Sequence, residues 1–182
     1  MSDERFEVVG YVPSHDEPTV PGNMPISAVI SETPADVKLS IQFDRILDHS
    51  GNVFNVHTGL LPGWGGNDIL YHSLKRGAQE QGITFHKITE RLDYGPIISR
   101  MSYPVFPTDD MVDLYARMAA ILPDFVVASL ALLSEIGLDQ VNNCFSEEPV
   151  MFRRGQFDLA DEQEYRATPD RLRKRFPRDL SS

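Results

Sequence analysis

The chain has 182 residues, of which 41% are hydrophobic and 24% charged, so it can bury the core of one globular domain. Its net charge of −10 argues against a broad nucleic-acid surface, because phosphate binding requires clustered Lys and Arg. The single cysteine excludes an internal disulfide and a cysteine-based zinc cluster. This cysteine usage predicts a cytoplasmic protein, and the charged N-terminus is unlike a signal peptide.

Charge and apolar patterning divide the chain into two regions. Residues 151–182 carry a net charge of +2, which leaves −12 on residues 1–150. We therefore expect a main domain over residues 1–150 and a helical tail over residues 151–182 that packs on or over it. The basic tail is typical of a solvated helix face, and a lid over an anionic substrate is the alternative. The longest apolar stretch, residues 118–133, is broken by Pro123 and Asp124, which favours a buried helix over a membrane span.

In chain order, short apolar runs at residues 6–12, 26–31, 37–43 and 54–58 predict strands. From residue 67 the apolar spacing is helical, and Gly77 is predicted to end that helix. Residues 82–89 and 97–105 return to strand character. Thr108 is predicted to cap a long helix that is kinked at Pro123 and ends near Gly137, and Thr168 to begin a last helix.

This alternation predicts an α/β fold with a Rossmann-like, open, mainly parallel sheet flanked by helices. Ligands of such sheets lie beyond the carboxyl ends of the strands, so the residues after the strand at 54–58 are where we expect a site. Asn55 and His57 lie two residues apart in that strand, so their side chains share one face. Taken alone, the pair is more typical of a polar cap on a strand end than of a catalytic site.

Three longer segments change that balance. They are Asn-Val-His-Thr-Gly-Leu-Leu-Pro-Gly-Trp-Gly-Gly at 55–66, Gly-Ile-Thr-Phe-His at 82–86 and Leu-Asp-Tyr-Gly-Pro-Ile-Ile at 92–98. In this order and spacing they resemble the folate-dependent formyltransferases, which include glycinamide ribonucleotide transformylase, methionyl-tRNA formyltransferase, sugar N-formyltransferases and formyltetrahydrofolate hydrolase. The resemblance runs from about Val37 to about Leu133. It implies transfer of a formyl group from 10-formyltetrahydrofolate to a primary amine of a small substrate.

The resemblance also implies a role for each matching residue. Asn55 would donate to the developing oxyanion, His57 would handle the proton of the amine, and Asp93 would orient His57. No metal is implied. The resemblance places the folate site at Phe43, Ile46, Leu47, Leu92 and Asp93, and the substrate site at Gly59, Trp64 and Gly65.

Four residues are interpreted either as members of the site or as structural residues. Trp64 either walls the pocket or covers the core. His86 matches the second histidine of the family, and a hydrogen-bonded structural role is favoured for it over catalysis. Cys144 is interpreted as a small buried hydrophobe, and His72 as a surface residue.

Two departures from the family pattern bear on the substrate. The strand at residues 6–12 matches the second strand of the family, so we expect the first strand and its Gly-rich phosphate loop to be missing, which disfavours glycinamide ribonucleotide. The exposed sheet edge would then need a cover, for which a homodimer partner is one candidate. The loop after Pro62 also lacks the usual basic residue. The acceptor predicted is an amino sugar or a sugar nucleotide; the alternatives are a 10-formyltetrahydrofolate hydrolase and a non-catalytic folate-binding scaffold.

Overall fold

A computed structural model of the chain describes residues 35–41, 51–153, 155 and 159–175. Within these ranges a four-stranded sheet has the order β1-β2-β4-β5, formed by Lys38–Ile41, Val53–His57, Glu80–Lys87 and Ile97–Pro104. A second, two-stranded ladder pairs β3 (Gly65–Gly66) with β6 (Met151–Phe152). The strands predicted at residues 6–12 and 26–31 lie outside the described residues.

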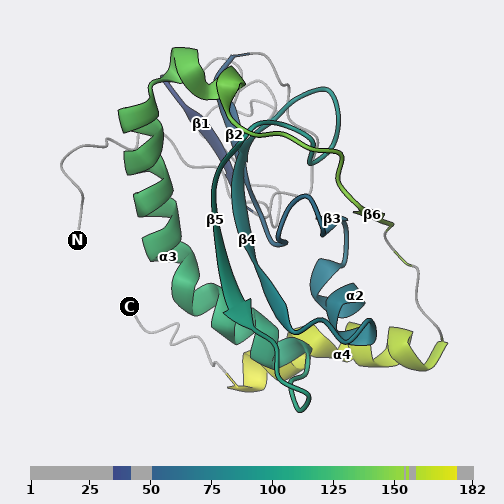
Figure 1. Cartoon of the computed structure of the whole chain (residues 1–182). Helices are drawn as coiled ribbons and strands as arrows, with labels where there is room; N and C mark the ends of the chain where they lie inside the picture. The colour runs from purple at the N-terminus through teal and green to yellow at the C-terminus, as the bar shows by residue number, and fades with distance from the viewer. Residues whose placement is uncertain (1–34, 42–50, 154, 156–158, 176–182) are drawn as a thin grey trace, which may run out of the picture.

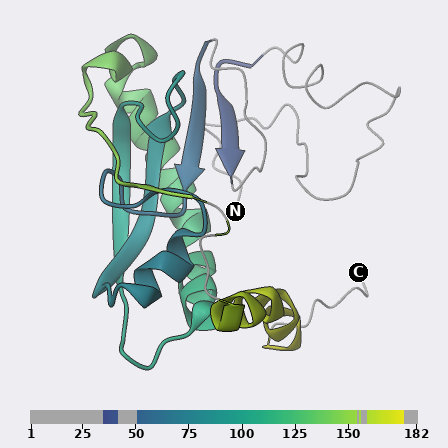
Figure 2. The same cartoon turned by 90° about the vertical axis from the view of Figure 1, so that its right-hand side faces the viewer.

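Four helices complete the described part of the chain. They are α2 (Ile69–Lys75), α3 (Met111–Ile136), the 3₁₀-helix η1 (Leu138–Asn143) and α4 (Leu159–Arg175). Figure 1 shows α3 running along one face of the sheet, with α2 and the β3–β6 ladder on the other side. Turning the molecule by 90° shows α4 crossing below the sheet, close to the first turns of α3 (Figure 2).

The sheet is mixed, so the prediction of a mainly parallel sheet is wrong. Only β1 and β2 are parallel, whereas β2–β4 and β4–β5 are antiparallel. The segment 88–96 between β4 and β5 is shorter than the dozen or more residues that a parallel crossover requires. The helix between β2 and β4 has only seven residues, about 10 Å, so it does not return the chain to the start of β2.

The core lies between the sheet and α3. Phe54 and Val56 of β2 and Ile83 and Phe85 of β4 are almost completely buried, and they belong to one cluster with residues of α3 such as Leu114. Phe54 and Phe85 stack with ring centroids 5.3 Å apart. Because strand side chains alternate between faces, packing these four residues into the core leaves their polar neighbours on the opposite face.

Only one face of α3 is buried, although a buried helix was expected. Met118, Phe125 and Leu133 pack inward, while Val127 and Leu132 are exposed. Its length and mean hydropathy of 1.8 would also suit a bilayer-crossing helix, which alone is weak evidence. Since the inward face packs on the sheet, α3 acts in this fold as its covering helix.

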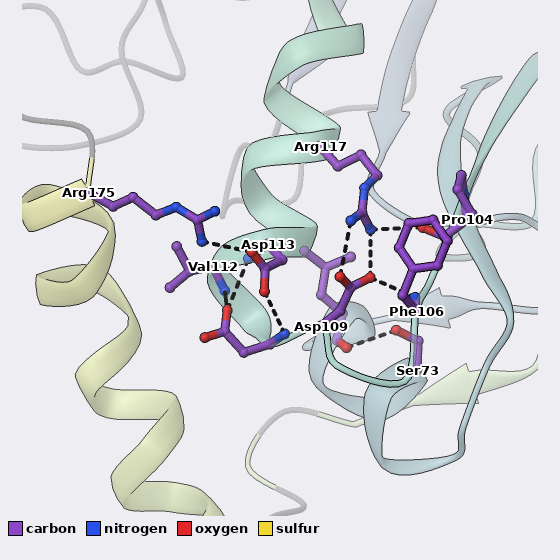
Figure 3. Close-up of polar contacts among 10 residues, drawn as sticks. Ser73, Pro104, Phe106, Asp109, Val112, Asp113, Arg117 and Arg175 are labelled. Atoms are coloured by element: carbon purple, nitrogen blue, oxygen red, sulfur yellow. Dashed lines mark hydrogen bonds and ion pairs between the residues drawn. The ribbon is translucent and has the colours of Figure 1, made fainter.

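The first turn of α3 is capped by Asp110, two residues later than the predicted cap, Thr108. Asp110 accepts from the backbone N–H groups of Val112 and Asp113, and Asp113 accepts from the backbone N–H of Asp110 (Figure 3). This reciprocal capping box satisfies more free donors than the Thr108 hydroxyl would. The predicted C-terminal end at Gly137 is confirmed.

The last helix begins at Leu159 rather than at Thr168, so Pro169 lies inside it. Polar contacts along α4 hold it against the body: Tyr71 donates to Asp161 at 2.8 Å, and Tyr165 donates to Asp68 at 2.7 Å. Arg171 pairs with Asp110. Arg175 donates to Asp113 at 2.7 Å, as Figure 3 shows. These contacts begin more than one turn before Pro169, which explains why the helix extends upstream of the predicted start.

Candidate active site

The register of β2 against β4 assembles the polar face of the sheet. Asn55 is paired with His86, and His57 with Thr84. All four side chains lie on the face opposite the core, because they alternate with buried Phe54, Val56 and Phe85 on the same two strands. The two residues predicted from β2 therefore meet two further polar residues contributed by β4.

Asp93 joins these residues from the loop between β4 and β5. Its Oδ1 lies 3.7 Å from His57 Nδ1 and 3.7 Å from His86 Nε2, and its Oδ2 accepts a 2.7 Å hydrogen bond from the Gly66 N–H. Asp93 has φ 55°, a left-handed conformation that aspartate tolerates better than most residues. The carboxylate is only 6% exposed, so it faces the two imidazoles with little screening by water.

The turn that presents Asp93 depends on Gly95. A Cβ added to Gly95 would lie 1.7 Å from the carbonyl oxygen of Lys87, much closer than any side-chain atom can approach. The close contact also lets the Lys87 N–H donate to the carbonyl of Pro96 at 2.9 Å. Glycine is therefore required for the loop to return close enough to β4 for Asp93 to reach the imidazoles.

His57 is held from its other ring nitrogen. Its Nε2 lies 2.7 Å from the carbonyl oxygen of Trp64, and since a carbonyl only accepts, Nε2 carries a proton. His57 is 7% exposed, and Gly59 packs so closely beside it that a Cβ there would lie 2.8 Å from Nε2 and 2.4 Å from the Trp64 carbonyl oxygen. The loop from 59 to 64 thus orients the imidazole through its backbone.

Thr84 anchors this loop to the sheet. Its hydroxyl donates to the Gly59 carbonyl at 2.6 Å and accepts from the Leu61 N–H at 3.1 Å, and the residue is fully buried. Arg100 of β5 adds a 2.8 Å hydrogen bond to the Leu61 carbonyl. The threonine of the Gly-x-Thr-x-His segment therefore positions the loop that orients His57.

His86 is an uncharged member of the site at neutral pH. Burial lowers its pKa from 6.5 to about 4, since the charged ring would lose its hydration. The Asp93 carboxylate opposes this shift, the neighbouring His57 adds to it, and the hydrogen bond to the Lys87 carbonyl opposes it. The ring is 2% exposed, in agreement with the dominance of burial.

The structure brings together the three residues predicted as catalytic, Asn55, His57 and Asp93. Of the residues predicted to bind folate, Leu92 is next to Asp93 in sequence and 59% exposed, so its side chain is available to a ligand. Phe43, Ile46 and Leu47 lie outside the described residues. Within the described part of the chain, no group of three or more His, Cys, Asp or Glu side chains is arranged to hold a metal ion.

The residues predicted to bind the acceptor line the turn after β2 and have structural partners there. Gly59 packs against His57. Trp64 stacks on Phe152 of β6 with ring centroids 5.1 Å apart, while its carbonyl holds His57, so it supports the site from behind. Gly65 belongs to β3, and a Cβ on it would lie 2.9 Å from the Met151 side chain.

Sequence reasoning missed the parts played by Thr84 and Phe152, and it gave His86 no specific partner. Alternation along β4 places Thr84 and His86 on one face, and applying it to that strand as to β2 would have found both. Phe152 has no comparable signal, because it reaches Trp64 from a two-residue strand almost 90 positions away. His72, interpreted as a surface residue, is buried and stacks on Phe152 at 4.8 Å.

An amide, an imidazole and a carboxylate thus converge at one face of the mixed sheet, a set of groups that can stabilise an oxyanion and move a proton. Comparison with known proteins identifies the family. Residues 26–130, more than half of the chain, match the formyl transferase family. The chain therefore belongs to the formyl transferase family.

The individual relatives act on different substrates. The phosphoribosylglycinamide formyltransferase of Escherichia coli is 35% identical over 89 residues, covering 46% of this chain and 42% of that protein. A methionyl-tRNA formyltransferase of Aromatoleum aromaticum is 34% identical over 79 residues, covering 43% of this chain and 25% of the relative. The chain thus spans less than half the length of either curated relative.

Among solved structures, the formyltransferase PseJ from Anoxybacillus kamchatkensis, in complex with UDP-4,6-dideoxy-4-formamido-L-AltNAc and tetrahydrofolate, has the same fold. The two superpose with a TM-score of 0.54 at 20% identity, over 71% of this chain and 68% of PseJ. At this level of identity the likeness concerns the fold.

Proposed function

We propose that this chain transfers a formyl group from 10-formyltetrahydrofolate to a primary amine of a small substrate. The observation that carries the proposal is the convergence of Asn55, His57 and Asp93 on one face of the sheet, with Asp93 3.7 Å from the His57 ring. Family membership supports the reaction class. The proposed acceptor is an amino sugar or a sugar nucleotide, a class represented among the similar folds by PseJ.

The residues present suit a reduced-folate donor. Among the described residues, the Asn55 side chain hydrogen-bonds only to His86, which leaves an N–H of its amide for a ligand oxygen. Exposed Leu92 lies next to Asp93 and offers apolar surface beside the polar cluster. The donor would supply the activated formyl carbon on which the amine reacts.

Each residue then has a task that its geometry suits. Asn55 donates a hydrogen bond to the oxygen that gains negative charge, and such a donor is worth roughly a hundredfold or more in turnover. His57 holds a proton on Nε2 against the Trp64 carbonyl, so its Nδ1, which faces Asp93, is the atom at which a proton is exchanged. Asp93 Oδ1 lies 3.7 Å from that atom and is placed to accept a hydrogen bond from the proton that arrives there.

The experiment compares wild type with Asp93→Asn in two assays, formyl transfer to a panel of amino sugars and binding of 5-formyltetrahydrofolate by calorimetry. Transfer should fall at least roughly a hundredfold while folate binding changes little, because the amide keeps the shape of the side chain but removes the carboxylate that faces His57 Nδ1. Asp124→Asn, an exposed carboxylate on α3, is the matched control and should behave as wild type.

Three results would contradict the proposal. Formate release from the donor without any acceptor, at the rate measured with acceptor, would assign the chain as a hydrolase. Folate binding with neither transfer nor hydrolysis would make it a binding scaffold, and equal activity of Asp93→Asn and wild type would remove Asp93 from the mechanism.

A further inference from the structure

The direction of the Asn55 amide decides whether it can stabilise a negatively charged oxygen. A carboxamide has a donor and an acceptor end of nearly equal shape, so its orientation is set by its hydrogen-bond partners. The side-chain nitrogen of Asn55 lies 3.3 Å from Nε2 of His86, its cross-strand neighbour. The state of that imidazole nitrogen therefore determines which end of the amide faces it.

The opposite nitrogen of His86 settles the tautomer. Nδ1 lies 3.0 Å from the carbonyl oxygen of Lys87, and a carbonyl only accepts, so Nδ1 carries the hydrogen. A neutral imidazole has one N–H, and burial keeps His86 neutral. Nε2 is consequently an acceptor, and the group that faces it must be a donor, which for Asn55 is the NH₂ end.

We propose that His86 is a positioning residue that fixes the direction of the Asn55 amide, with one N–H on His86 Nε2 and the second left for the oxygen of the reacting group. The proposal rests on the donor role assigned to Asn55 above. In the other tautomer, or protonated, His86 would present an N–H at Nε2. Asn55 would then turn its carbonyl oxygen toward the ring and lose the correct orientation.

The surroundings of His86 favour the acceptor state at Nε2. The Lys87 carbonyl accepts a hydrogen bond from the only N–H of the neutral ring, and the Lys87 ammonium donates elsewhere, to the side-chain oxygen of Asn142 at 3.3 Å. The charged or titratable groups that face the ring are Asp93, 3.7 Å from Nε2, and His57, whose ring lies edge-on at 6.5 Å between centroids. Their effects on the charge of His86 are opposite, and burial prevails.

Kinetics on substituted enzymes separate positioning from packing. His86→Leu removes the acceptor and should lower kcat roughly tenfold or more with little change in KM for the donor, whereas His86→Gln can again offer an oxygen to Asn55 and should recover most of the loss. Tyr103→Leu, at a buried residue near the end of β5, is the control for a cavity or packing effect and should leave kcat within about threefold.

A double-mutant cycle makes the assignment sharper. If His86 acts through Asn55, His86→Leu should cost almost nothing further in an Asn55→Ala background. Fully multiplicative losses in the double variant would overturn the proposal, as would a folded His86→Gln enzyme no better than His86→Leu.

Nitrogen NMR of the wild-type protein tests the same inference without activity. The His86 ring should show a protonated Nδ1 and an unprotonated Nε2 at about pH 7, and a protonated Nε2 would refute the proposal. Absence of formyl transfer in wild type would refute the proposed function, and the tautomer would still decide whether His86 orients Asn55.

Discussion

Mild acid should weaken the fold through His86. The pKa of this buried ring is about 4 in the folded chain against 6.5 in the unfolded chain, so unfolding takes up a proton at any pH between these values. Stability is therefore greatest above the unfolded pKa and is lost as the pH falls from about 6.5 toward about 4. The loss from this one group is about 2 kcal/mol between pH 7 and pH 5 and approaches about 3 kcal/mol near pH 4.

The assay is urea unfolding of wild type and His86→Gln across this range, with the difference in unfolding free energy plotted against pH. Other groups titrate in both proteins and largely cancel, so the wild type should lose about 2 kcal/mol relative to the variant between pH 7 and pH 5. A difference that is flat with pH, or that favours wild type more strongly in acid, would refute the argument that burial keeps His86 neutral.

Three further perturbations test the supports of the site. Thr84→Val should cost about 2–4 kcal/mol of unfolding free energy, because a buried carbonyl and a buried N–H lose their partner, and Thr84→Ser should restore most of it in urea titrations. Gly95→Ala should lower turnover roughly a hundredfold, because its new Cβ would lie 1.7 Å from the Lys87 carbonyl oxygen and force the loop away. Gly63→Ala should be active, because no atom lies closer than 3.5 Å to a Cβ there. Equal activities of the two variants would contradict the requirement for glycine at position 95. Arg171→Ala removes the partner of Asp110 and should speed proteolysis within residues 159–175, while the free energy of unfolding changes by less than about 1 kcal/mol. An unchanged cleavage rate would show that this ion pair does not hold α4 against the body.

Local patterns predicted the strands around the site well. The period-2 alternation that places Asn55 and His57 on one face holds in the structure, since residues 54 and 56 are buried beneath α3. Gly77 and Gly137 follow the ends of α2 and α3 as expected. These features depend on neighbours a few residues apart, which is the range over which sequence patterns carry physical information.

The parts that sequence reasoning missed depend on partners distant in the chain. Strand direction is invisible in a short apolar run, and an eight-residue strand such as β4 has the same composition in a parallel or an antiparallel sheet. Asp110 caps α3 in place of Thr108 because Asp113 completes a reciprocal pair with it. The start of α4 likewise depends on Asp68 and Tyr71, which lie about 90 positions earlier.

The roles of the individual site residues remain predictions, and the structure adds the geometry from which to test them. Asn55, His57 and Asp93 were assigned by resemblance, and their convergence required the β2–β4 register and the turn at Gly95. Neither could be derived from spacing alone, because register depends on which faces are buried in the assembled sheet.

The short ladder between β3 and β6 determines how far the chain can be truncated from its C-terminal side without disturbing the site. The formyl transferase match ends at residue 130, yet Phe152 stacks on Trp64, and the Gly65 N–H donates to the Val150 carbonyl at 2.9 Å. Trp64 in turn holds His57 through its carbonyl. A truncation designed on the family boundary would therefore remove the residues that pack against the loop of residues 59–64, so a shortened chain that keeps this packing extends at least through Phe152.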